Sequence, residues 1–228
     1  MESNPADDRG LFRLPRNLRD DIYRRVLVIP HPLNLFAEGG SHKVELFVPG
    51  PRPRHWSALL STNHQIHDEA IKILYGSHQF VLVDTSRGQA TLLQSFLSSI
   101  GSINASHLRH ICINFPAVDK GSEEAASSSP LREEDLRGLK LLQDMCGNLT
   151  TLEAYVHDKN SRGLVVTNGH RADSISPDDT KRALAEVETQ FRAISSLRKV
   201  VVQRYDGPLK PEVEELMQSF GWVVVLGR

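Results

Sequence analysis

Apolar residues recur along the chain in two patterns. Apolar positions that return every three or four residues predict amphipathic helices, whereas short continuous or alternating apolar runs predict strands. Helices are expected at about residues 14–27, 56–75, 86–100, 136–146, 177–194 and 211–220. Strands are expected in a hairpin over 33–48 and at 79–83, 108–115, 151–156, 197–202 and 222–226.

This alternation predicts an α/β (or α+β) fold in which an N-terminal helix and hairpin join a mixed sheet. Strand–helix–strand connections favour right-handed crossovers and a partly parallel sheet. Leu108, Leu152 and Leu197 each stand near a predicted helix-to-strand junction, 44 and 45 residues apart. Both a degenerate leucine-rich-repeat-like arrangement and a compact α/β sheet explain this spacing.

Polar stretches divide the chain. Residues 1–10 are predicted to be a disordered lead. Residues 11–115 are predicted to hold the first helices and the hairpin, and residues 131–228 are predicted to continue the α/β pattern. These last two regions are expected to pack as one globular unit. Loops over 117–130 and 158–176 are predicted to be mobile because they are polar and poor in apolar anchors. The first loop contains Ser129-Pro130, a candidate phosphorylation site.

Composition narrows the classes of partner. The net charge of −1 offers no strongly basic face, so a nucleic-acid partner is not expected. No run approaches the ~18 apolar residues of a membrane helix, so no membrane association is expected. Cys112 and Cys146 cannot form a disulfide framework. Together with a polar start unlike a secretory signal, they favour an intracellular protein, cytoplasmic or nuclear.

Two histidine pairs are the nearest approach to a metal motif. His64 and His67 are three apart on a predicted helix, and His107 and His110 are three apart where a strand begins. A zinc site needs further ligands from elsewhere, and no H-E-x-x-H or C-x-x-C is present. Surface or hydrogen-bonding roles therefore explain both pairs. No phosphate loop or nucleophile elbow is present, so we assign no catalytic, cofactor or metal residues and expect no enzyme.

Glu69 borders the apolar face of the second helix. It follows Ile66 by three residues and precedes Ile73 by four. Because a buried carboxylate without a partner is costly, Glu69 or its neighbour Gln65 should bind backbone groups of the hairpin or a basic residue of the first helix, such as Arg19.

Two segments carry the clearest pattern. Residues 14–23 read LPRNLRDDIY, and residues 59–75 read LLSTNHQIHDEAIKILY. Together they resemble the F-box-like proteins of filamentous fungi, with the pattern L-P-x-x-L-R-x-x-I-Y, a spacer, then L-L-x-T-x-x-Q-I-x-x-E-A-x-x-x-L-Y. The resemblance covers residues 12–115. It departs from a standard F-box because a hairpin and a proline loop interrupt it at about residues 31–55, and a cysteine-arginine-x-tryptophan-like end is missing.

The resemblance implies a non-catalytic, substrate-recruiting subunit of a cullin–RING ubiquitin ligase. The N-terminal helix would dock on a Skp-type adaptor protein, and the remaining chain would recruit an unknown protein substrate. The residues that this carries over as partner-binding are Leu14, Pro15, Leu18, Ile22 and Val26.

Two alternatives remain open: an α/β scaffold or effector-type binding protein of the same family that binds no ligase, and an unrecognised enzyme. An exposed stripe at Leu18, Ile22 and Val26 would favour docking, and burial of that stripe under the hairpin would favour the scaffold. A deep pocket lined by polar groups would favour the enzyme. We also expect apolar residues of the two motif helices to pack together or onto the sheet: Leu14, Leu18, Ile22, Leu59, Ile66, Ala70 and Leu74.

Overall fold

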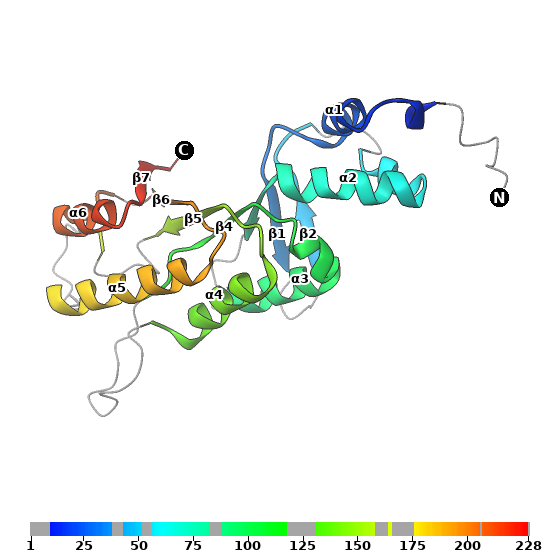
Figure 1. The fold of residues 1–228 in the computed structure, drawn as a ribbon. Coiled ribbons are helices and arrows are strands. Elements are labelled where there is room, and N and C mark those ends of the chain that lie inside the picture. The colour runs from blue at the N-terminus through cyan, green and yellow to red at the C-terminus, as the bar shows by residue number, and fades with distance from the viewer. Residues whose placement is uncertain are drawn as a thin grey trace.

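The central feature of the computed structural model is one seven-stranded sheet (Figure 1). The structure describes residues 10–37, 43–51, 56–82, 88–117, 131–157, 164–165, 176–205 and 207–227. The strands are β1 (Leu33–Ala37), β2 (Val44–Phe47), β3 (Gln79–Leu82), β4 (His110–Asn114), β5 (Thr151–Val156), β6 (Lys199–Arg204) and β7 (Val223–Leu226). Their order is β2-β1-β3-β4-β5-β6-β7. Only the β1–β2 hairpin is antiparallel among these neighbours, which confirms the α/β class and the hairpin.

Helices connect the strands. They are α1 (Arg16–Leu27), α2 (His64–Ser77), α3 (Gln89–Ala105), α4 (Glu133–Met145), α5 (Pro177–Ala193) and α6 (Pro211–Ser219), with short 3₁₀ turns at Leu11–Arg13 and Ala58–Ser61. Ser176 caps α5, since its Oγ accepts a hydrogen bond from the Asp179 amide at 3.1 Å. Residues 1–9 of the predicted lead and most of the two predicted mobile loops, Ser129-Pro130 included, lie outside the described residues.

The two faces of the sheet differ. Successive side chains of a strand point to opposite faces, so Ile111, Leu152 and Val202 share one face. These three side chains are buried, and Figure 1 shows α3, α4 and α5 lying along one side of the sheet. Within the described part of the chain, no helix covers the other side of β4, β5 and β6 (Figure 1). We call that second side the open face.

The helix-to-strand junctions repeat, and two of the three predicted leucines, Leu108 and Leu197, stand at them. The amides of Leu108, Leu149 and Leu197 each donate to the carbonyl three residues earlier, at 3.2, 3.0 and 2.9 Å. Leu152, predicted as the middle member, instead lies inside β5 beside Ile111. The junction is set by this turn rather than by the strand that follows it, so Leu149 is the structural equivalent.

Two boundaries around α2 differ from the prediction. The expected helix over 56–75 begins only at His64, because Asn63 caps it: the Asn63 side chain accepts a hydrogen bond from the Ile66 amide at 2.9 Å. At the other end, α2 passes the predicted limit at residue 75 and continues through Gly76 to Ser77, before the extended His78. The chain therefore passes from α2 into β3 without a left-handed glycine.

The third helix runs beyond its predicted end at residue 100. Gly101, with φ of 78°, kinks α3 and lets a last turn continue to Ala105. A left-handed residue of this kind is tolerated because glycine has no Cβ. The kink places Ala105 in the buried core next to the junction at Leu108.

Candidate functional site

The two motif helices are joined by a clasp of polar side chains around Glu69. Arg19 on α1 donates from Nε to Glu69 Oε2 at 2.8 Å and from an Nη atom to Oε1 at 2.7 Å. The Tyr23 hydroxyl donates to Oε2 at 2.9 Å, and Gln65 donates to Oε1 at 3.2 Å. The third guanidinium nitrogen of Arg19 donates to the Leu14 carbonyl at 2.7 Å. The predicted Arg19 partner for Glu69 is thereby confirmed.

Charge and burial act together in this clasp. The hydrogen bonds from Arg19 lower the pKa of Glu69 to about 2, and they outweigh the burial that would raise it. Burial, with the bond to Glu69, raises the pKa of the Tyr23 hydroxyl. The Glu69 carboxylate is therefore ionised at neutral pH, and the Arg19 fork fixes the angle at which α1 lies on α2.

The clasp decides which face of α1 is buried. Tyr23 and Leu27 are completely buried, whereas Leu18 is 47% and Val26 41% exposed. Leu18 and Leu27 are nine residues apart, which is two and a half helical turns, so they point in opposite directions. The expectation that Leu18 packs into the core is wrong for this reason. Leu14 and Ile22 are half-buried at the border between the two faces.

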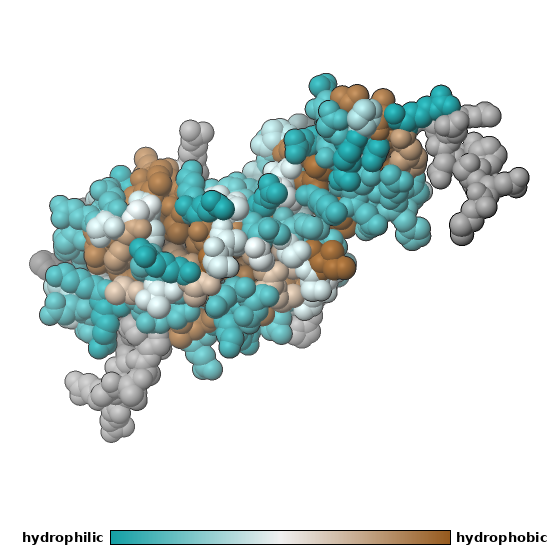
Figure 2. All heavy atoms as spheres, viewed as in Figure 1, coloured by the Kyte–Doolittle hydropathy of each residue, from teal (hydrophilic) through white to brown (hydrophobic). Residues whose placement is uncertain are grey.

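The outward side of α1 combines apolar residues with internally paired charges. Leu18 and Val26 are eight residues apart, so they are separated by about 12 Å along the axis. Arg16 pairs with Asp20 at 2.6 Å and Arg25 with Asp21 at 2.9 Å, both at i,i+4 spacing. Figure 2 shows hydrophobic spheres at the outer edge of the molecule over α1. This helix presents an anchored apolar surface, and its neighbouring charges already have partners.

A second group of polar side chains lies on the open face. His110 donates from Nε2 to Glu153 Oε1 at 2.8 Å, and Gln203 donates to Glu153 Oε2. Gln79 donates to Cys112 Sγ at 2.8 Å. These residues come from β3, β4, β5 and β6, and His110 and Cys112 share one face because they are two residues apart on β4. We call His110, Cys112 and Glu153 the open-face cluster.

The open-face cluster is buried unevenly. Cys112 is fully buried, Glu153 is nearly so, and the His110 side chain is 30% exposed. Burial, followed by the nearby Glu153 carboxylate, raises the pKa of the Cys112 thiol to about 12. Burial also acts to raise the pKa of Glu153, but hydrogen bonds from His110, Cys112 and Gln203 prevail and lower it. The sequence contained a signal for this cluster in the i,i+2 spacing of His110 and Cys112, but no local pattern connects them to Glu153.

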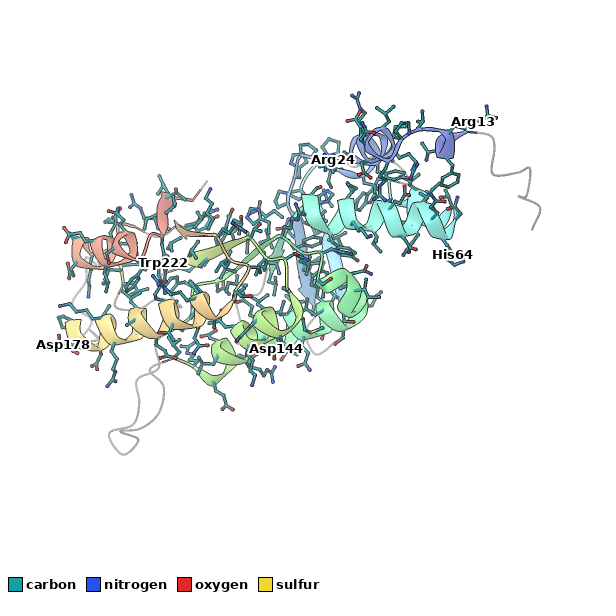
Figure 3. All side chains as sticks on the ribbon, viewed as in Figure 1. Arg13, Arg24, His64, Asp144, Asp178 and Trp222 are labelled. Atoms are coloured by element: carbon teal, nitrogen blue, oxygen red, sulfur yellow. The ribbon has the colours of Figure 1, made fainter. Side chains whose placement is uncertain are left out.

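The surface and hydrogen-bonding roles expected for the two histidine pairs are found. His64 is exposed at the outer end of α2 (Figure 3), and His67 contacts the Leu60 carbonyl through Nδ1 at 2.8 Å. His107 is half-buried at the junction before β4, and His110 bonds to Glu153. The three-residue spacing therefore brings neither pair together as ligands, and the side-chain partner of His110 is Glu153 on the neighbouring strand.

A hollow of about 350 Å³ opens between the hairpin and the helices. Its lining is mainly apolar and includes Leu33, Trp56, Phe80 and Phe96, with Glu45 among its few polar members. Tyr75 stacks on Phe80, which closes one wall. This lining suits apolar contacts and does not bring several titratable groups together.

Comparison of the chain with protein-family models, with curated proteins and with solved structures found no match. Among the described residues, no helix has both the length and the apolar character needed to cross a membrane.

Proposed function

We propose that the protein is a non-catalytic protein-interaction module whose N-terminal helix docks on a Skp-type adaptor of a cullin–RING ubiquitin ligase, so that the rest of the chain can recruit a protein substrate. The observation that carries the proposal is the exposure of Leu18 and Val26 on a helix that Arg19 and Glu69 hold in place. An apolar face on a helix that is already fixed can bind a groove with little further loss of conformational entropy.

The resemblance of residues 14–23 and 59–75 to F-box-like proteins supports the choice of partner. The four residues that define the clasp, Arg19, Tyr23, Gln65 and Glu69, all belong to the two resembling segments. The pattern is thus consistent with a helix pair of fixed geometry. Of the residues that the resemblance implies as partner-binding, Leu18 and Val26 suit docking because they are exposed. Leu14 and Ile22 are half-buried, so each offers only part of its surface to a partner.

The test is binding of the purified chain to a purified Skp-type adaptor by isothermal titration calorimetry. The informative variant changes Leu18 and Val26 together to glutamate, because both side chains are exposed and the fold should tolerate the change. Binding is expected at micromolar concentrations or tighter and should be lost in the double variant. It should also survive moderate salt, because screening weakens exposed charge pairs far more than apolar burial.

Ile103→Glu is the matched control. Ile103 is 75% exposed on α3, away from α1, so this variant places one glutamate at another exposed apolar position and should bind like the wild type. Circular dichroism must show that both variants are folded. Absence of binding by the wild type would overturn the ligase proposal and leave the scaffold of the same family as the better description.

A further inference from the structure

We propose that His110, Cys112 and Glu153 bind one zinc ion on the open face of the sheet, with the fourth coordination position open to solvent. A ring nitrogen of His110, Sγ of Cys112 and a carboxylate oxygen of Glu153 all lie within 4.8 Å of one another. This proposal is independent of adaptor binding by α1.

The strands bring the three ligand atoms close to the spacing that zinc requires. Cys112 and Glu153 are register partners on adjacent parallel strands, and His110 is on the same face as Cys112. Tetrahedral zinc with bonds of about 2.0–2.3 Å holds its ligand atoms roughly 3.3–3.8 Å apart. His110 Nε2 and Glu153 Oε1, now 2.8 Å apart, would need to separate by about 0.5 Å as the ion replaces their hydrogen bond. Small side-chain rotations provide this without moving the sheet.

The donor set favours zinc over harder or softer ions. A thiolate excludes Mg²⁺ and Ca²⁺, which prefer oxygen ligands, and a carboxylate makes the site a poor one for Cu(I). Imidazole, thiolate and carboxylate are all zinc ligands, and three protein ligands are the number found in zinc sites that keep an open fourth position. Binding exchanges the Cys112 thiol proton for the metal, and that proton passes to solvent.

Among the described residues, no arginine or lysine pairs with Glu153, whose partners are His110, Gln203 and Cys112. A divalent ion would supply the positive charge that Arg19 supplies to Glu69. Because the His110 side chain is partly exposed, the ion can enter from the open face.

Neighbouring polar groups are arranged to support the ligands. Gln203 donates to Glu153 Oε2, which leaves Oε1 as the oxygen nearest His110. The Tyr205 hydroxyl donates to Gln203 Oε1 at 3.0 Å and orients that amide. Gln79 donates to Cys112 Sγ, and this bond would also stabilise a thiolate. Such outer partners commonly change metal affinity by about 10–100-fold when removed.

The experiment is titration of the chelator-treated full chain with Zn²⁺ by calorimetry, followed by Co²⁺ substitution and absorption spectroscopy. We expect one zinc per chain, and a cobalt spectrum with a sulfur-to-metal charge-transfer band and tetrahedral d–d bands. Cys112→Ser should abolish the charge-transfer band and weaken zinc binding more than tenfold. Glu153→Gln, which keeps the size of the side chain, should also weaken binding more than tenfold.

Cys146→Ser is the matched control, since Cys146 is also a buried free cysteine but lies at the end of α4. It should keep both the band and the affinity of the wild type. A wild-type chain that binds no stoichiometric zinc, or a cobalt spectrum without a thiolate band, would overturn the site. A band that persists in Cys112→Ser and disappears in Cys146→Ser would do the same. The cobalt spectrum of the wild type decides the matter even if a ligand variant fails to fold.

Discussion

The clasp between α1 and α2 and the open face of the sheet both bury a glutamate, and they treat it differently. Glu69 receives a charged two-point contact from Arg19, so its negative charge is neutralised inside the fold. Glu153 receives hydrogen bonds from His110 and Gln203 and has no fixed cation among the described residues. The first carboxylate is therefore suited to holding two helices together, and the second is suited to accepting a positive charge from outside.

The largest expected effect comes from the apolar contacts beside Glu69. Ile66→Ala removes a buried side chain from α2 and should lower the free energy of unfolding by about 2–5 kcal/mol. Urea denaturation measures this loss. Ile103→Ala, at an exposed position of α3, is the control and should change stability by no more than about 0.5 kcal/mol. An unchanged midpoint for Ile66→Ala would mean that α2 does not pack as described.

Removing the clasp carboxylate should have the next largest effect. Glu69→Ala leaves the Arg19 guanidinium and the Tyr23 hydroxyl without their acceptor, and should cost about 2–3 kcal/mol. The value lies at the low end for a broken ion pair because the Arg19 side chain, 12% exposed, can regain some water. The same denaturation experiment applies. A cost below that of Glu153→Ala in zinc-free protein would reverse the contrast between the two glutamates.

Acidification should remove the contribution of the Glu69 carboxylate to the stability of the fold. The pKa of Glu69 is lowered to about 2 in the folded chain, below its ordinary value of 4.5. Its contribution to stability is therefore fully present above about pH 4.5 and is lost as the pH falls from 4.5 towards 2. The stability difference between the wild type and Glu69→Gln, measured in urea at pH 6, 4 and 3, should shrink with acid. A difference that stays constant would show that the carboxylate is not specifically stabilised.

The smallest effect is expected on the open face. Gln203→Ala removes one donor from Glu153, and Glu153 keeps His110, so the loss of stability should be about 1 kcal/mol or less. Thermal unfolding in the presence of a chelator is the measurement. A loss larger than that of Glu69→Ala would mean that the open face, not the clasp, holds the more critical carboxylate.

Much of the framework could be predicted from the sequence. Every predicted strand is found near its expected position, because apolar runs between polar turns give a local signal. The Arg19–Glu69 pairing could also be anticipated, since an acid at the border of an apolar helix face needs a partner. Local patterns succeed where the cause of the structure is itself local.

Two features could not be predicted in this way. The apolar positions 14, 18, 22 and 26 define a regular stripe, yet α1 buries Tyr23 and Leu27 instead. The rotation of the helix is set by Glu69, which is 46 residues from Tyr23. Likewise, Glu153 meets His110 across 43 residues through strand register, which no spacing within either segment encodes.

The order of the strands bears on how the chain comes to be folded during synthesis. Every described strand after the first pairs with a strand that precedes it: β2 and β3 flank β1, and β4 to β7 then add one at a time. After β1, each of these strands finds a partner that the ribosome has already made. Each new strand pairs with one that precedes it closely in the chain, so only the loop of that connection has to be closed at each step. The conformational entropy of loop closure is therefore lost in small steps. The sheet can therefore grow outward in the direction of translation, with each newest strand serving as the template for the next.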